Sequence, residues 1–354
     1  MSPDGTPDLR AIEVIAPNLK RRLSGVTATV VRLVPLQART IGIVATGPGL
    51  PPHVPHLPLW RMFVMPRNRL RVWHARRNTE MALGLVLRGL FRRRLALLFT
   101  SASQRRHTGY TRWLIARMDG LIATSARSAR YLERRAEVIH HGIDTEGFSP
   151  PVDRAALRRR LGLPEVDVIL GCFGRIRAQK GTDAFVDAAI DLLQDRPGMT
   201  ALVMGRATEG HEAFLGELKA RAAAAGLADR IRFMPEVPVH DIADWYRALD
   251  LYVAPQRWEG FGLTPLEAMA CGVPVVATRV GAFEEIVTED TGSLVPPGDV
   301  PALASAIAAL LDDAARRNRA GRAALERVRS RFRLDAEAAA LVAVYRRLLA
   351  GERW

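Results

Sequence analysis

Short, continuous apolar runs recur along this sequence, and each leads through a loop into a helical pattern. Val168–Phe173 is one such run, and a glycine-containing loop and the helical segment TDAFVDAAIDLL follow it. A strand that is apolar on both faces is typical of a parallel sheet covered by helices on both sides. Because the same alternation fills both halves of the chain, we predict an α/β protein with two doubly wound parallel sheets.

The length of the chain supports two domains. Its 354 residues suffice for two domains of ordinary size, each with its own core. The consecutive prolines Pro150 and Pro151 mark a linker, so we place the first domain at residues 1–150 and the second at 151–333. The long helical pattern near the C-terminus is interrupted at Arg333 and Leu334.

The positive charge is confined to the first half. Residues 1–150 hold 24 Lys and Arg against 9 Asp and Glu, whereas residues 151–354 hold 27 against 28, so the first half accounts for the whole net charge of +14. Such a surface attracts polyanions, either nucleic acid or an anionic membrane. A nucleic-acid-binding protein is the non-enzyme alternative, but residues 1–150 show neither interleaved aromatics nor a known module.

The sequence also indicates a compartment. No apolar run approaches the roughly 18 to 20 residues that a membrane span needs. The N-terminal segment MSPDGTPDLR lacks the apolar core of a secretory signal. The two cysteines, Cys172 and Cys271, lie in segments that we expect to be buried, so no disulfide framework is predicted. We therefore expect a cytoplasmic protein.

Residues 257–281, RWEGFGLTPLEAMACGVPVVATRVG, indicate a ligand site. They predict a loop, a helix from Pro265 to Ala270, a turn at Gly272 and a buried strand, with Thr264 as the N-cap. A helix that starts directly after a glycine loop suits an anion such as a diphosphate. The alternative is a capping box, Thr264-x-x-Glu267, in which Glu267 only starts the helix.

The wider pattern around this helix resembles a known family. Glu259 and Glu267 form an E-x7-E pair within EGFGLTPLEAMACGVPVVAT, which is similar to the nucleotide-sugar site of family 4 glycosyltransferases of GT-B fold. The resemblance implies two Rossmann-like domains that face a cleft. It implies that Glu259 contacts the transferred sugar and that Glu267 binds the ribose. The backbone of Phe261, Gly262 and Leu263 would lie against the phosphates, together with Thr264 at the helix start.

A second motif, G-R-x-x-x-x-K-G, follows the run Val168–Phe173. In the family its Arg and Lys, here Arg175 and Lys180, hold the donor diphosphate. Two cations stabilise the negative charge of a leaving nucleotide without any proton transfer. The chain has no Asp-x-Asp and no His/Cys cluster with metal spacing, so we expect no metal cofactor. Solvated loop cations are the alternative.

The junction HHGIDTEGFSP, which ends at Pro150, resembles the segment that joins the two domains of this family. The family fold also implies that the last helix, Leu334–Leu349, returns to the first domain, so that residues 334–354 pack on it. Before this, residues 81–94 predict an amphipathic helix that ends in arginines. Such a helix either lies on an anionic membrane or buries its apolar stripe in the core.

Candidate acceptor-binding residues fall in three places of the first half. Ser24 and Gly25 match an acceptor loop of the family, although the usual pair of glycines is missing and a solvated basic turn is the alternative. Arg76 and Arg77 follow a predicted strand, at an edge where open sheets bind ligands.

The third place is the segment SQRRHT. Family members often carry a histidine directly after the equivalent of LLFT, where this chain has Ser101, Ala102 and Ser103. His107 is the nearest replacement, and we expect it to be catalytic or to bind the acceptor. Arg105 and Arg106 suit a carboxylate or phosphate, which arginine binds with two parallel hydrogen bonds.

Several segments of the first half resemble a bacterial subgroup, the lipopolysaccharide-core mannosyltransferases that transfer mannose from GDP-mannose to the inner-core sugar Kdo. They are PNLKRRLSGVTATVVRLVPLQ, HARRNTEM and FTSASQRRHT. The resemblance implies retention of anomeric configuration, a lipid-linked anionic acceptor and a peripheral location on the inner face of the cytoplasmic membrane. The alternatives are UDP-glucose or another UDP-sugar with a different anionic acceptor, and a GT-B nucleotide-sugar epimerase.

Overall fold

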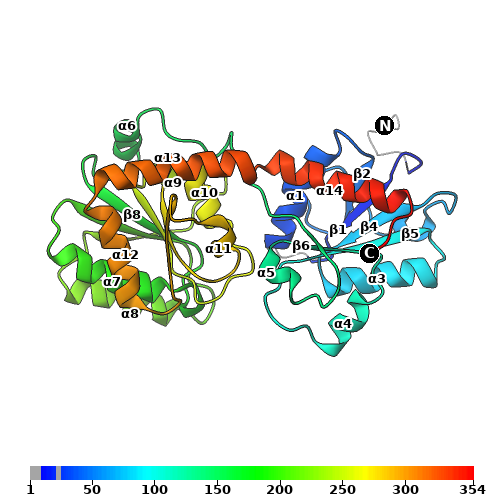
Figure 1. Ribbon diagram of the computed structural model, residues 1–354, viewed down its shortest axis with the longest axis horizontal. Coiled ribbons are helices and arrows are strands. Elements are labelled where there is room, and N and C mark those ends of the chain that lie inside the picture. Colours follow the sequence, from blue (N-terminus) through cyan, green and yellow to red (C-terminus); the bar gives the residue numbers. More distant parts are fainter. Residues whose placement is uncertain (1–8, 21–24) are drawn as a thin grey trace. The chain divides into compact units, whose positions relative to one another are not determined.

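The computed structural model describes residues 9–20 and 25–354, and the chain divides into two compact units (Figure 1). Unit 1 comprises the chain up to His140 together with Leu334–Trp354, and unit 2 is His141–Arg333. The boundary lies before the predicted one at Pro150, because the linker is bound to unit 2. The backbone N–H of Ile143 donates to the carbonyl oxygen of Phe332 at 2.7 Å, and Phe148 packs against the core of unit 2.

Unit 1 is built on a seven-stranded sheet in the order β3-β2-β1-β4-β5-β6-β7, in which all paired strands are parallel. The central strands are apolar and buried on both faces, as helices on both sides require. The strands are β1 (Val14–Pro17), β2 (Ile43–Thr46), β3 (His56–Leu57), β4 (Arg71–Ala75), β5 (Leu95–Ser101), β6 (Gly120–Ala123) and β7 (Glu137–Val138).

Helices cover both faces of this sheet. Leu33 of α1 and Leu341 of α14 belong to one core cluster, while Met81 of α3 and Leu114 of α4 belong to the other. The apolar stripe of the predicted helix 81–94 is thus a core face, and the helix itself spans Asn78–Gly89. The helices are α1 (Gly25–Gln37), α2 (Arg61–Val64), α3 (Asn78–Gly89), α4 (Gly109–Ile115), α5 (Ala126–Ala129) and α14 (Leu334–Leu349).

Unit 2 repeats this plan with six parallel strands in the order β10-β9-β8-β11-β12-β13. Its strands are β8 (Val168–Phe173), β9 (Met199–Met204), β10 (Ile231–Met234), β11 (Leu251–Ala254), β12 (Val275–Thr278) and β13 (Gly292–Val295). Its helices are α6 (Arg154–Arg160), η1 (Ala178–Lys180), α7 (Thr182–Gln194), α8 (Glu212–Ala224), α9 (Ile242–Arg247), α10 (Thr264–Ala270), α11 (Phe283–Ile286), α12 (Val300–Leu311) and α13 (Ala314–Arg331).

Two parallel sheets with flanking helices confirm the predicted fold class. In each sheet the strand order reverses at one place, between β1 and β4 in unit 1 and between β8 and β11 in unit 2. Ligands of doubly wound sheets bind beyond the carboxyl ends of the strands at such a switch point. Ligand sites are therefore expected in the loops that follow these four strands.

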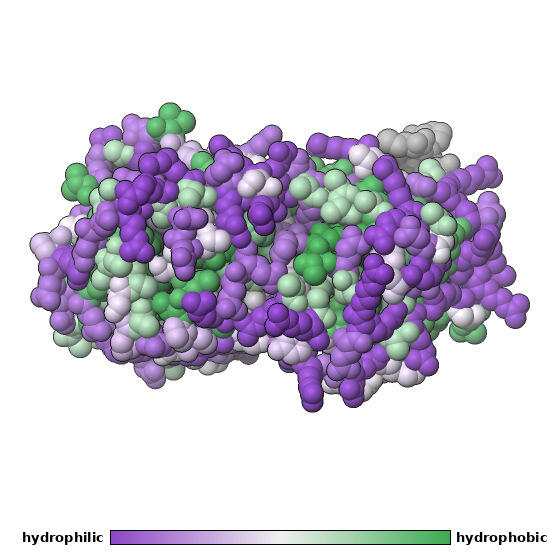
Figure 2. Space-filling model, in the orientation of Figure 1, coloured by the Kyte–Doolittle hydropathy of each residue, from purple (hydrophilic) through white to green (hydrophobic). Residues whose placement is uncertain are grey.

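The thiols of Cys172 and Cys271 are free and buried, and burial raises the pKa of each to about 12. Hydrophilic side chains cover most of the face of each unit seen in Figure 2, with small groups of hydrophobic residues between them. Within the described part of the chain, no helix combines the length and the apolar character needed to cross a bilayer.

Candidate functional sites

The loop after β8 forms the first half of a site in unit 2. Gly174 directly follows the strand and has φ +139°. Gly205, directly after β9, lies so close that a Cβ on it would be 1.8 Å from the Gly174 carbonyl oxygen. Arg175 is exposed in this loop, and Lys180 ends η1 directly before α7. The two predicted diphosphate ligands line one pocket together with Gly174, Thr182 and Gln256.

An ion pair joins this loop to the one that follows β11. Lys180 Nζ lies 2.5 Å from Glu259 Oε2, and the two side chains are only 23% and 17% exposed. Glu259 Oε1 accepts the backbone N–H of Gly260 at 3.0 Å. The structure thus brings together two residues that were predicted from separate motifs.

A second ion pair fixes the loop after β11 to the first turn of α7. Arg257 donates from both terminal nitrogens to Asp183, at 2.7 and 2.8 Å. Burial alone raises the pKa of Asp183, but the hydrogen bonds and charge of Arg257 outweigh it and hold the pKa below its ordinary value. Neither residue was predicted, since nothing in the sequence links positions so far apart.

Helix α10 starts one residue earlier than predicted. Leu263 already has helical backbone angles and is the N-cap, so the prediction of Thr264 as N-cap is wrong. The Thr264 side chain hydrogen-bonds instead with Tyr252, whose hydroxyl donates to the carbonyl oxygen of Phe173 at 3.2 Å. The capping box is also absent, because no side chain caps this helix. The helix does end before Gly272, which has φ +76°.

Glu267 is oriented by a residue that the sequence did not reveal. The hydroxyl of Tyr246 donates to Glu267 Oε2 at 2.8 Å. Burial and the neighbouring Glu267 carboxylate raise the pKa of Tyr246 well above its ordinary value, so this hydroxyl remains a donor. Tyr246 lies on α9 among core aromatics, and its pattern in the sequence is that of any buried tyrosine.

The glycine loop before α10 is restricted in its backbone conformation and by close packing. Gly262 has φ +89°, and a Cβ there would lie 2.3 Å from the Phe283 ring. The Phe261 side chain is 4% exposed, and its ring meets the edge of the His141 ring at a centroid distance of 4.9 Å. Phe261 is therefore a core anchor, and only its backbone is suited to face a ligand.

Gln256 is a further residue of this site that was not predicted. It follows β11, is 4% exposed and lines the pocket of Arg175 and Lys180. Its buried Oε1 has no hydrogen-bond partner within the described chain. Buried polar atoms are nearly always hydrogen-bonded, so this oxygen suits a hydroxyl or N–H of a ligand.

In unit 1, the loops that follow β1 and β4 are joined by a buried polar network. Asn18 Oδ1 accepts from Thr27 Oγ1 and from Arg77 Nη1, each at 3.0 Å. Arg77 also pairs with Glu80 at 2.7 Å, with side chains 11% and 0% exposed. Arg77 therefore has an internal structural role.

The predicted loop of Ser24 and Gly25 is seen only in part. Ser24 lies outside the described residues. Gly25 begins α1, and a Cβ on it would meet no atom of the described residues within 4 Å, so their packing does not require a glycine there.

Glu80 also positions Arg76. Glu80 Oε2 accepts the Arg76 backbone N–H at 2.7 Å, and Arg76 Nη1 donates to the His74 carbonyl oxygen at 3.3 Å. Arg76 Nη2 is buried without a hydrogen-bond partner among residues 9–20 and 25–354. Acidic residues are common in the first turn of a helix, so the sequence does not predict that Glu80 binds Arg76 and Arg77.

A pocket at the ends of β4 and β5 gathers most of the predicted acceptor residues. His107 lines it with Nε2 buried and, in the described chain, unpartnered. Burial and the charge of Arg105 lower the pKa of His107, which is therefore neutral at pH 7. Arg77 is absent from the lining, which includes Arg76, Asn78, Ser101, Ser103, Arg105, Arg106, His107 and Thr108.

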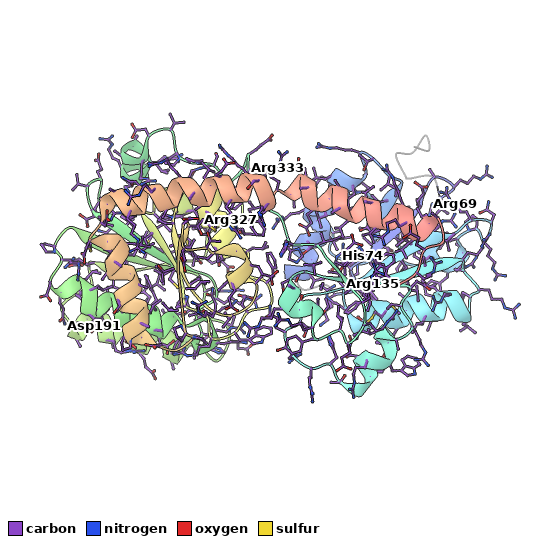
Figure 3. The ribbon with its side chains drawn as sticks, in the orientation of Figure 1. Arg69, His74, Arg135, Asp191, Arg327 and Arg333 are labelled. Carbon is purple, nitrogen blue, oxygen red and sulfur yellow. The ribbon has the colours of Figure 1, made fainter. Side chains whose placement is uncertain are left out.

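His74 lies on β4 (Figure 3) and belongs to the core. Its Nδ1 is 2.7 Å from the Tyr345 hydroxyl, and its Nε2 is 2.7 Å from Thr100 Oγ1. Burial, with a smaller contribution from Arg76, lowers its pKa well below the ordinary value. His74 thus supports the strand end from inside as a neutral imidazole.

Sequence comparison finds relatives that match nearly the whole chain. The family model described as glycosyl transferases group 1 matches residues 153–327. The lipopolysaccharide core biosynthesis mannosyltransferase LpsB of Rhizobium meliloti is 54% identical over 351 residues, which cover 97% of this chain and 99% of LpsB. The lipopolysaccharide core biosynthesis mannosyltransferase LpcC of Rhizobium leguminosarum is 54% identical over 354 residues, with coverages of 98% and 99%.

Solved structures confirm the predicted GT-B fold. HepE of Anabaena, crystallised in complex with UDP, superposes with a TM-score of 0.82 at 21% identity and covers 94% of this chain and 99% of its own. The C-terminal domain of the glycosyl transferase LpcC from Francisella tularensis is 34% identical, with a TM-score of 0.51 over 55% of this chain and all of that domain.

Proposed function

This chain belongs to the group 1 glycosyl transferases, and we propose that it is a retaining mannosyltransferase that moves mannose from GDP-mannose to Kdo of the lipopolysaccharide inner core. The observation that carries the proposal is the 54% identity to two lipopolysaccharide core mannosyltransferases over nearly the whole chain. That identity includes unit 1, where the family resemblance puts acceptor selection.

The donor diphosphate would bind at the switch point of unit 2. Arg175 and Lys180 follow β8 and supply two positive charges next to the start of α7. A lysine ammonium has three N–H donors, so Lys180 can keep Glu259 and still donate to a phosphate oxygen. We propose that these two cations stabilise the leaving diphosphate and that no metal ion is needed.

The two glutamates would bind opposite ends of the donor. Glu259, fixed by Lys180 and Gly260, would contact hydroxyls of the transferred mannose. Glu267, oriented by Tyr246, would accept hydrogen bonds from the ribose hydroxyls. Gln256 Oε1, which has no partner in the described part of the chain, would accept a hydrogen bond from the bound donor. Fixing the sugar in this way lowers the barrier by orientation.

The pocket of unit 1 is suited to an anionic acceptor. Arg76 lines it with Nη2 buried, and Arg105 and Arg106 add two further cations. Kdo carries a carboxylate, which arginine binds in a bidentate manner. The neutral His107, with Nε2 unpartnered within the described residues, would accept a hydrogen bond from the attacking hydroxyl.

A lipid-linked acceptor also explains where the enzyme would work. The acceptor would lie in the inner face of the cytoplasmic membrane, and we propose that the protein binds this surface peripherally. The excess of 15 positive charges in residues 1–150 would favour an anionic surface.

Transfer to Kdo-bearing lipid A by the purified protein tests the proposal, with GDP-mannose, UDP-glucose and UDP-N-acetylglucosamine as competing donors. We expect mannose incorporation from GDP-mannose alone, with retained configuration at the new linkage. Incorporation from a UDP-sugar would overturn the donor assignment. Release of GDP without transfer would keep the donor site and overturn the Kdo acceptor.

A further inference from the structure

Two segments of unit 1, residues 58–69 and 86–94, form one continuous surface. The Arg93 guanidinium reaches across and donates to the carbonyl oxygens of Phe63 and Met65. The Phe63 and Phe91 rings meet edge to face at 4.9 Å. The short helix α2 is thereby fixed beside the C-terminal end of α3, and we call this surface the α2–α3 patch.

The α2–α3 patch exposes large apolar side chains. Trp60 is 61% exposed, Val64 is 60% exposed and Leu90 is 77% exposed, whereas their neighbours Met62 and Leu87 are buried in the core. A single exposed apolar residue needs no explanation. Several on two segments that are fixed side by side mark a site of association with another surface.

The charge around these residues has a single sign. Arg67, Arg92 and Arg94 are exposed, and no carboxylate of the described chain lies within ion-pair distance of them. The sequence contains no Asp or Glu between Glu13 and Glu80. Glu13 itself is paired with Arg69, which lies shortly before β4 (Figure 3). Asp119 likewise pairs with Arg88 at 2.7 Å, so within the described chain the positive charge of Arg67, Arg92 and Arg94 is the part of the patch that no ion pair neutralises.

We propose that the α2–α3 patch docks on an anionic lipid bilayer, with Trp60, Val64 and Leu90 entering the interfacial region and Arg67, Arg92 and Arg94 contacting lipid phosphates. Tryptophan favours the membrane interface because it has an apolar body and a polar N–H. Arginines around the apolar residues complement the negative surface of the bilayer. A nucleic acid would complement the charge but leave the three apolar side chains in water.

This inference deepens the proposed function, because it specifies how the enzyme would reach a lipid-linked acceptor. It does not depend on the donor or on Kdo. Binding to vesicles without lipopolysaccharide therefore tests the patch alone, and its failure would leave the transfer assay unaffected.

Sedimentation of the full-length protein with lipid vesicles is the test. Vesicles of phosphatidylglycerol and phosphatidylethanolamine are compared with vesicles of phosphatidylcholine. The apolar variant is Trp60→Ser/Val64→Ser/Leu90→Ser, and its matched control is Val152→Ser/Val166→Ser/Val239→Ser, which removes three exposed valines from unit 2. Circular dichroism verifies that each variant is folded.

The charge of the patch has its own variant and control. Arg67→Gln/Arg92→Gln/Arg94→Gln removes the three arginines. Arg316→Gln/Arg319→Gln/Arg329→Gln removes three exposed arginines of α13 in unit 2, so that the net charge changes equally.

We expect the wild type and both controls to bind anionic vesicles and not phosphatidylcholine. The serine variant should bind anionic vesicles at least about tenfold more weakly. A tenfold change corresponds to about 1.4 kcal/mol, which is less than the transfer free energy of one fully buried apolar side chain. Each arginine removed should lower binding about fivefold. Equal binding by the patch variants and the wild type, or no binding by the wild type, would overturn the proposal. So would a glutamine variant that loses duplex-DNA binding but keeps vesicle binding.

Discussion

The Lys180 ammonium lies 2.5 Å from the Glu259 carboxylate, and this contact joins the loops that follow β8 and β11. The strand order of unit 2 reverses between these two strands, so both loops begin at the same point of the sheet edge. One residue carries the positive charge proposed for the diphosphate and the other the carboxylate proposed for the sugar. Their contact holds both groups in place before a donor binds.

Removing either partner of this ion pair should impair turnover. Glu259→Ala should lower kcat about a hundredfold, because the sugar is no longer fixed. Lys180→Ala should lower it about a hundredfold to a thousandfold, as loss of one charge-stabilising donor does elsewhere. Steady-state kinetics with GDP-mannose measures both, and Lys219→Ala on the exposed face of α8 is the control. Full turnover by Glu259→Ala would remove that residue from the mechanism.

The pocket of unit 1 should determine the acceptor KM. Arg105→Gln/Arg106→Gln should raise the acceptor KM about tenfold or more and leave the donor KM unchanged, since a charge-assisted hydrogen bond contributes about 1.5–3 kcal/mol. The control is Arg135→Gln, an exposed arginine of the same unit (Figure 3). A change confined to the donor KM would contradict the assignment of this pocket.

The stability of the protein should fall in mild acid because of His74. Its folded pKa is lowered by burial, so below the ordinary value of about 6.5 the unfolded chain binds a proton that the folded chain does not. The free energy of unfolding therefore decreases as the pH falls below that value, and this group contributes up to about 1.4 kcal/mol per pH unit to the decrease. Urea unfolding between pH 7 and 5 measures the slope, which should be smaller in His74→Gln. An equal slope in the variant would rule out His74 as its source.

Glu80 should be important for stability although it is not in a pocket. Glu80→Ala leaves the Arg77 guanidinium buried and without its carboxylate, which should destabilise unit 1 by about 3–5 kcal/mol. Glu133→Ala is the matched control, because its ion pair with Arg112 is exposed, and it should cost about 0–1 kcal/mol. Urea denaturation of the two variants gives the comparison, and similar values would disprove the role given to Glu80.

Replacing two glycines of unit 2 by alanine should change the stability of the protein in opposite directions. Gly262→Ala places a Cβ against the Phe283 ring at a positive φ, which should destabilise the protein by more than about 1 kcal/mol and displace the loop of Glu259. Gly216 lies within α8 with nothing within 4 Å of an added Cβ, so Gly216→Ala should stabilise it by up to about 1 kcal/mol. Thermal unfolding of both variants tests this, and stabilisation by Gly262→Ala would refute the packing argument.

The fold class was predictable because apolar runs alternate with amphipathic segments, and this alternation is visible without any tertiary information. The residues around Glu259 and Lys180 were predictable because each belongs to a contiguous motif. Tyr246, Gln256 and Glu80 were not, since they reach their sites only through the topology of the sheets. Thr264 was assigned wrongly as N-cap because the sequence cannot show that Leu263 already has helical angles.

The end of the predicted helix 81–94 shows the same limitation. Its apolar periodicity continues past Gly89, where the helix stops, and Arg92 has a positive φ of 50°. The arginines after Gly89 are therefore part of a loop. Whether Arg93 points into the protein or to solvent depends on the carbonyls of Phe63 and Met65, which lie in a distant segment.

Tyr345 comes from α14, and its contact with His74 lies inside unit 1, whose remaining residues all precede position 141. The order in which the two units are synthesised therefore differs from the order in which they can finish folding. On the ribosome, the first 140 residues emerge early but lack α14, which covers one face of their sheet together with α1. Unit 2 emerges as one uninterrupted segment and can finish folding first. Unit 1 must wait for Leu334–Leu349, so a chain that terminates before this helix would leave the apolar side chains beneath it open to chaperones and proteases.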